Sequence, residues 1–167
     1  MINQKLINPK SIVICGASTD EHKPGGKLLV NLLNSNFKGD IYLVNPKEDE
    51  IRGIKCYHTV EELPQVDCAI MAIAAKFCPH TVDVLAHQKG TGGFIIVSAG
   101  FSEENAEGAK LEKEIVDHIN SVGGSLIGPN LLNRVKKDEG WTTHFATGAY
   151  TSCPNKKFRC PITFILK

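Results

Sequence analysis

Residues 11–34 read SIVICGASTDEHKPGGKLLVNLLN, and this stretch decides the fold. Its first five residues form an apolar run rich in β-branched side chains, which is typical of a buried strand. A segment rich in Gly, Ser and Pro follows, and residues 27–34 then carry leucines at helical spacing. A strand, a glycine-rich loop and a helix in this order predict the first unit of a parallel sheet.

The same alternation continues along the chain to residue 130. We predict strands at residues 11–15, 41–44, 67–72, 93–98 and 125–127, and helices at residues 27–34, 76–88 and 103–122. Near-continuous apolar strands that alternate with amphipathic helices indicate a parallel sheet covered on both faces. The predicted fold class is therefore α/β, a single Rossmann-like domain with a doubly wound parallel sheet.

Length and charge exclude several classes of protein. The chain has 167 residues, the size of one ordinary domain, and a formal net charge of +1. Without a polybasic field we expect no nucleic-acid partner, and no apolar run reaches the roughly 20 residues of a membrane span. Residues 1–10 lack the apolar core of a signal peptide, so we expect a cytoplasmic protein with no membrane partner.

The residue types that usually carry chemistry show no catalytic or metal-binding pattern. The six cysteines form no Cys-x-x-Cys pair, which predicts buried free thiols rather than a zinc or redox site. Cys78 stands beside a predicted helix start, a place that lowers a thiol pKa, but no base accompanies it. The six histidines match no metal-ligand spacing and no serine lies in a nucleophile elbow, so we predict no metal site and no catalytic residues.

Ligands of doubly wound sheets bind at the carboxyl ends of the strands, so the loops there are the candidate site. The first loop carries Gly16, Ala17 and Ser18, followed by residues 23–26 (Lys-Pro-Gly-Gly) at a helix start. Glycines allow close backbone approach, and the free N–H groups of a helix N-terminus attract anions. The loop is a predicted phosphate cradle, although it lacks the Gly-x-Gly-x-x-Gly fingerprint. The alternative is a tight turn that packs strand on helix.

The loop after the second predicted strand reads Val44-Asn45-Pro46-Lys47. An NAD site places Asp or Glu here to bind the ribose, whereas a lysine suits the phosphorylated ribose of NADP or of coenzyme A. A solvated surface lysine is the alternative interpretation. Small residues also follow the third and fourth predicted strands, where they would let a ligand chain run close to the backbone.

Charge changes abruptly near residue 130. Residues 1–130 carry 12 basic and 16 acidic residues, a net of −4, and residues 131–167 carry 7 and 2, a net of +5. We therefore predict a domain at residues 1–130 and an atypical tail at residues 131–167, of truncated or frameshifted origin.

Six motifs occur in a familiar order: residues 7–13, 16–18, 23–26, 44–47, 97–103 and 127–130. Together they resemble the N-terminal CoA-binding domain of the NDP-forming acyl-CoA (acetyl-CoA) synthetases, relatives of the succinyl-CoA synthetase alpha subunit. The resemblance implies that coenzyme A is the cofactor. It places the CoA phosphates on the first loop, the phosphorylated adenosine end at Lys47, and the thiol end near Asn130.

The resemblance also implies which residues line the adenine and pantetheine path, namely residues 74–77 and 97–99. The full implied set of CoA-binding residues is Gly16, Ala17, Ser18, Lys23, Pro24, Gly25, Gly26, Asn45, Pro46, Lys47, Ala74, Ala75, Lys76, Phe77, Val97, Ser98, Ala99 and Asn130.

The chain departs from this family after Asn130. The family continues with Cys and a Gly-containing run into a second domain, whereas Leu131 follows here. The phosphohistidine and ATP-grasp domains of the synthetases lie beyond that point and do not fit in 167 residues. The resemblance thus implies part of an ADP-forming acid–CoA ligase, inactive alone, with the remaining synthetase domains or subunit as partners. The alternatives are an NADP-binding oxidoreductase module and a standalone CoA-binding protein.

Overall fold

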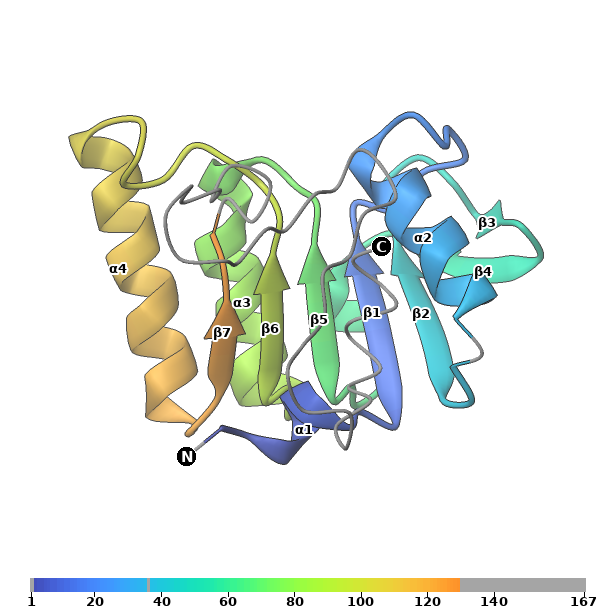
Figure 1. Ribbon diagram of the computed structural model, residues 1–167, viewed down its shortest axis with the longest axis horizontal. Helices are drawn as coiled ribbons and strands as arrows, with labels where there is room; N and C mark the ends of the chain where they lie inside the picture. The colour runs from blue at the N-terminus through green and yellow to red at the C-terminus, as the bar shows by residue number, and fades with distance from the viewer. Residues whose placement is uncertain (1, 36, 130–167) are drawn as a thin grey trace, which may run out of the picture.

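The computed structural model describes residues 2–35 and 37–129 of the chain. The predicted tail at residues 131–167, and Asn130 before it, lie outside the described residues. The strands are β1 (Ser11–Cys15), β2 (Asp40–Val44), β3 (Glu50–Ile51), β4 (Ile54–Tyr57), β5 (Cys68–Met71), β6 (Gly93–Ile96) and β7 (Ser125–Ile127). They form one sheet in the order β3-β4-β2-β1-β5-β6-β7 (Figure 1).

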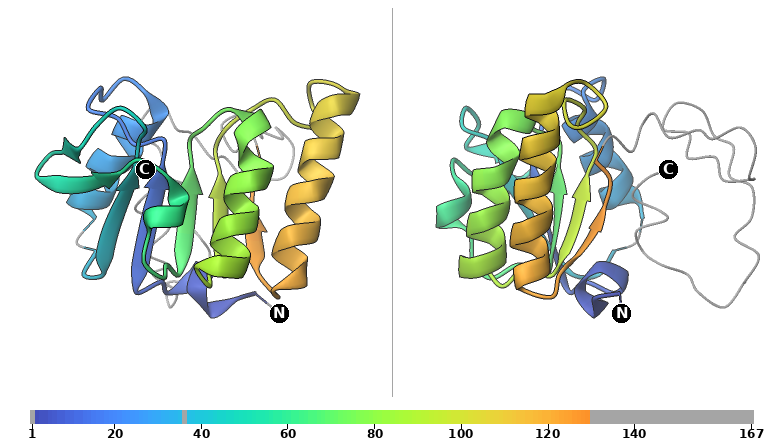
Figure 2. Two further views of the ribbon diagram at one scale, coloured as in Figure 1. Left: turned by 180° about the vertical axis from the view of Figure 1, so that it is seen from behind. Right: turned by 90° about the vertical axis from the view of Figure 1, so that its left-hand side faces the viewer.

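Helices lie on both faces of this sheet. The helices are α1 (Gln4–Ile7), α2 (Pro24–Asn34), α3 (Cys78–Gln88) and α4 (Ala106–Ser121), with short 3-10 turns η1 (Val60–Glu62) and η2 (Ala75–Phe77). Figure 2 shows α3 and α4 side by side on one face and α2 on the other. The six strands from β4 to β7 in the sheet order pair in parallel, in the strand order of a Rossmann fold. The predicted fold class is confirmed.

Burial explains why the strands read as apolar runs. Every residue of β1 is buried, and its side chains alternate between two core clusters. Val13 packs in the cluster that contains Leu85 of α3, while Ile14 packs in the cluster that contains Leu28 of α2. Full burial of each such side chain contributes about 1.5–3 kcal/mol, so the doubly covered sheet is the main source of stability.

One edge of the sheet differs from the sequence prediction. Strands β3 and β4 pair antiparallel, and Arg52 and Gly53 between them have φ values of 54° and 78°. Two positive φ values in succession form the tight turn that suits a two-residue hairpin. Strands of two and four residues are too short for a periodic pattern, so neither strand is predicted from the sequence.

Two helices begin at other residues than predicted, because of local interactions at their N-termini. Helix α2 begins at Pro24, three residues earlier than predicted, because proline fits the first helical position. Helix α4 begins after Asn105, whose side chain accepts a hydrogen bond from the Gly108 N–H at 2.9 Å. Of the cysteines, Cys15, Cys56, Cys68 and Cys78 are buried thiols that form no disulfide within the described residues, as predicted. Within the described ranges, no helix is both long and apolar enough to cross a membrane.

Candidate functional site

The strand order reverses direction between β1 and β5, and this switch point locates the candidate site. The chain leaves β1 for β2 on one side, and the later strands β5 to β7 are added on the other. Loops that leave adjacent strands toward opposite faces open a crevice at their carboxyl ends. In Figure 1 these ends form the upper edge of the sheet, where the loops after β1, β2, β5 and β6 gather.

The loop after β1 is fastened to the end of β2. The backbone N–H groups of Gly16 and Ala17 donate to the Val44 carbonyl at 2.9 and 3.3 Å. Gly16 has φ +85°, and a Cβ there would stand 2.5 Å from the Ala72 carbonyl oxygen, so only glycine fits. The Asn45 side chain completes the attachment, since its Nδ2 donates to the Ala17 carbonyl at 2.8 Å. The predicted cradle is therefore a rigid loop.

Helix α2 starts directly against this loop. A Cβ on Gly25 would overlap the Gly16 carbonyl oxygen, and one on Gly26 would overlap the carbonyl oxygen of Asp20. These glycines thus pack the helix on the loop. Lys23 is the N-cap residue and provides no side-chain cap bond in the described part of the chain. The N–H groups of the first turn are consequently available to an anion.

Three candidate lysines lie in the loops at this edge, and two of the acids there contact basic side chains. Lys23, Lys47 and Lys76 are exposed, and within residues 2–35 and 37–129 none of them forms an ion pair. By contrast, Glu21 pairs with Arg52 of the β3–β4 hairpin, and Asp49 contacts His58 at 3.0 Å. The ammonium groups of these three lysines are therefore open to a phosphorylated ligand.

Lys47 is held in place by its own loop. Asn45 Oδ1 accepts the Lys47 N–H at 2.8 Å, while the amide of the same side chain is bonded to Ala17. Asn45 thus couples the loop after β1 to the loop that carries Lys47. The sequence analysis placed Asn45 in the site but gave it no such role, because a bond to a residue 28 positions away leaves no local pattern.

The loops after β5 and β6 supply an apolar surface. Phe77 is 55% exposed, and the Lys76 ammonium lies 4.9 Å from the centre of its ring. The Ser98 hydroxyl donates to the Ile73 carbonyl, which joins the two loops. An exposed aromatic ring beside a cation offers a stacking face for a planar heterocycle.

Several candidate residues offer the ligand only their backbone. Ala17, Gly25 and Gly26 are buried, and the Val97 side chain is 2% exposed and packs in the core cluster on the α2 face. Ser98 is half-buried and Ala99 is exposed, whereas Asn130 lies outside the described residues.

The expectation that the helix start lowers the Cys78 thiol pKa is wrong. Cys78 is fully buried, and desolvation raises its pKa to about 12. Burial, with a smaller contribution from Cys78, likewise raises the Cys15 pKa to about 12. The cost of burying a thiolate thus outweighs the effect of the helix start on the pKa of Cys78.

Residues 10–125 match the family model described as a CoA binding domain. Trans-feruloyl-CoA synthase from an unknown prokaryotic organism is 41% identical over 162 residues, which cover 96% of this chain and 20% of that protein. Acetate–CoA ligase [ADP-forming] II of Archaeoglobus fulgidus is 40% identical over 142 residues, which cover 84% of this chain and 21% of the ligase. The first of these matches extends past residue 130; the domain boundary there stays a prediction.

A solved structure is also similar to this chain in fold and sequence. The dinucleotide forming acetyl-coenzyme A synthetase 1 of Ca. Korarchaeum cryptofilum, in complex with phosphate and ADP, superposes with a TM-score of 0.68 and 35% identity. The match covers 76% of this chain and 27% of the synthetase.

This chain belongs to the CoA binding domain family. The predicted family and its cofactor, coenzyme A, are thereby confirmed, and the chain is homologous to the CoA-binding part of ADP-forming acyl-CoA synthetases. It spans about a fifth of the length of the curated relatives it matches.

Proposed function

We propose that this chain is the CoA-binding part of an ADP-forming acyl-CoA synthetase and holds CoA across the carboxyl edge of its sheet. The observation that carries the proposal is the start of α2, which packs on the 16–18 loop and has no side-chain cap within the described residues. Lys47, in the loop that Asn45 joins to this one, forms no ion pair with any described residue. The CoA diphosphate binds the loop and the first N–H groups of α2, and Lys47 binds the 3′-phosphate.

The rest of the cofactor follows from the adjoining loops. Phe77 and its neighbour Lys76 form the stacking face for adenine, and the small residues 74–75 and 98–99 border the pantetheine chain. The thiol end would lie toward Asn130. In this arrangement backbone donors and a lysine bind the phosphates, and an exposed ring binds the adenine.

Acyl transfer to CoA requires more than this chain. The chain covers about a fifth of trans-feruloyl-CoA synthase and of the Archaeoglobus fulgidus ligase. Burial raises the pKa values of the Cys15 and Cys78 thiols. We propose that the remaining synthetase domains or a separate subunit supply the chemistry, and that the isolated chain forms no acyl-CoA from ATP, acid and CoA.

Calorimetric titration tests the Lys47 contact. Loss of a charge-assisted bond in Lys47→Ala should cost about 1.5–3 kcal/mol, which weakens CoA binding about 10- to 150-fold. Dephospho-CoA lacks the 3′-phosphate, so it should bind the variant and the original chain equally. Lys38→Ala, which removes an exposed lysine before the opposite end of β2, is the matched control and should leave both affinities unchanged.

The same titration separates the alternatives. NADP should bind much more weakly than CoA because it cannot occupy the pantetheine path. Equal affinity of the original chain for CoA and dephospho-CoA would contradict the role of Lys47, and tighter binding of NADP than of CoA would favour the oxidoreductase module.

A further inference from the structure

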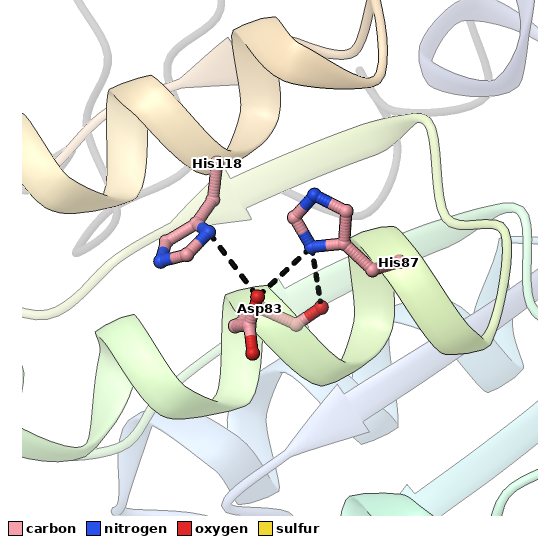
Figure 3. Close-up of side chains that lie close together, drawn as sticks. All are labelled: Asp83, His87 and His118. Carbon is pink, nitrogen blue, oxygen red and sulfur yellow. Dashed lines mark hydrogen bonds and ion pairs between the residues drawn. The ribbon is translucent and has the colours of Figure 1, made fainter.

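A second cluster of chemistry-bearing side chains lies at the opposite end of the sheet from the CoA site. Asp83 and His87 project from α3, and His118 projects from α4, which packs beside it (Figure 3). One ligand atom of each residue lies within 4.8 Å of the other two. Both histidines occupy the last turn of their helices, far along the chain from the loops at the carboxyl edge.

Two distances within the cluster are close to those between the ligand atoms of a bound metal ion. Asp83 Oδ1 lies 2.9 Å from His87 Nδ1 and 3.2 Å from His118 Nδ1. Zinc takes nitrogen and oxygen ligands at about 2.0–2.2 Å in a tetrahedron, which separates neighbouring ligand atoms by about 3.3 Å. Two imidazoles and one carboxylate form a donor set that suits zinc.

Hydrogen bonding aims His87 at this position. The Ser121 hydroxyl donates to the His118 carbonyl at 2.7 Å, so its oxygen accepts from the His87 Nε2–H at 3.0 Å. His87 Nδ1 then faces two acceptor oxygens, Asp83 Oδ1 at 2.9 Å and the Asp83 carbonyl at 3.1 Å. With Nε2 bonded to Ser121, Nδ1 is the ring nitrogen that can bind an ion beside the Asp83 carboxylate. A second ring nitrogen fixed by an outer hydrogen bond is the usual arrangement of metal-bound histidine.

The charges around the cluster and the exposure of its side chains suit a bound metal ion. The partial negative charge at the carboxyl ends of α3 and α4 attracts a cation, and Glu114 Oε1 lies 4.0 Å from His118 Nε2. The side chains are 43% exposed for Asp83, 42% for His87 and 28% for His118, so an ion can reach them from solvent.

We propose that Asp83, His87 and His118 bind one Zn²⁺ ion, with water in the fourth position, and that the ion joins α3 to α4. The sequence predicts no metal site because no two histidines within one helix or loop have metal-ligand spacing. Here Asp83 and His87 are one helical turn apart, and only the packing of α4 brings His118 to them.

Zinc titration of the full 167-residue chain against a colorimetric chelator tests the site, at about pH 7.5, above the ordinary pKa of histidine. The original chain should bind one equivalent that is weakened at least about tenfold in His118→Gln, since loss of a mere outer-sphere partner costs about 10- to 100-fold. His80→Gln is the matched control: His80 lies on the same helix and, among the described residues, pairs with one carboxylate, Glu61, at 2.9 Å. It should bind zinc like the original chain.

Imidazole NMR signals of the original chain provide a readout that does not depend on a variant's folding. Zinc should shift the ring signals of His87 and His118 and leave His80 unmoved, and should raise the Tm of the original chain but not of His118→Gln. Binding that is absent, or equal in the original chain and His118→Gln, would overturn the proposal. Shifts at His80 without shifts at His87 and His118 would do the same.

Discussion

Asn45→Ala removes the side chain that couples two loops of the CoA site. The variant loses two hydrogen bonds of 2.8 Å, one from Asn45 Nδ2 to the Ala17 carbonyl and one from the Lys47 N–H to Asn45 Oδ1. Its backbone bond to the Tyr57 carbonyl remains. A hydrogen bond contributes about 0.5–1.5 kcal/mol, and water can replace the exposed partner at Lys47. We therefore expect a loss of about 1–2 kcal/mol in the free energy of unfolding.

Asn45→Ala should weaken CoA binding by more than its loss of stability alone would explain. Lys47 loses the turn that positions it, so we expect about tenfold weaker CoA binding and a smaller change for dephospho-CoA. Urea denaturation measures the stability, and calorimetric titration measures the two affinities. Asn34→Ala, at the exposed end of α2, is the control and should stay within about 0.5 kcal/mol of the original stability. Unchanged stability and CoA affinity in Asn45→Ala would refute the coupling.

Three further substitutions or treatments test the site and its surroundings. Gly25→Ala should lower the free energy of unfolding by about 1–3 kcal/mol, because its Cβ overlaps the Gly16 carbonyl oxygen; a urea curve like that of the original chain would contradict this packing. Phe77→Ala should leave stability within about 0.5 kcal/mol, since the ring is exposed, yet weaken CoA binding in calorimetry by about 1–3 kcal/mol of lost stacking. Burial raises the Cys78 pKa to about 12, so at pH 8 iodoacetamide should label Cys78 only after denaturation, as peptide mass spectrometry can show; rapid native labelling would contradict its burial.

The parts of the fold that could be predicted are those whose signal is local. The buried strand β1 shows itself as four apolar residues after Ser11, and leucines at helical spacing indicate α2. The β3–β4 hairpin has too few residues for a period, and its turn depends on positive φ at Arg52, a residue type that gives little warning of it.

In the candidate site, too, single residues could be predicted from the sequence, whereas contacts between separate elements could not. Gly16 and Lys47 could be selected from sequence because loop position and residue type limit what they can do. The bond from Asn45 to Ala17, the pair of Glu21 with Arg52, and the meeting of His118 with Asp83 each join separate elements. The Cys78 pKa was misjudged for a related reason, since burial depends on packing that a helix start does not reveal.

Amide chemical-shift mapping during a CoA titration tests the central claim most directly. If CoA binds across the carboxyl edge, the largest shifts should fall on Gly16 to Ser18, on the first turn of α2, on Lys47 and on residues 74–77. Dephospho-CoA should reproduce all of these shifts except those at Lys47. Saturable binding with its largest shifts at the amino ends of the strands, or no shifts at residues 16–18 and in the first turn of α2, would contradict the proposed site.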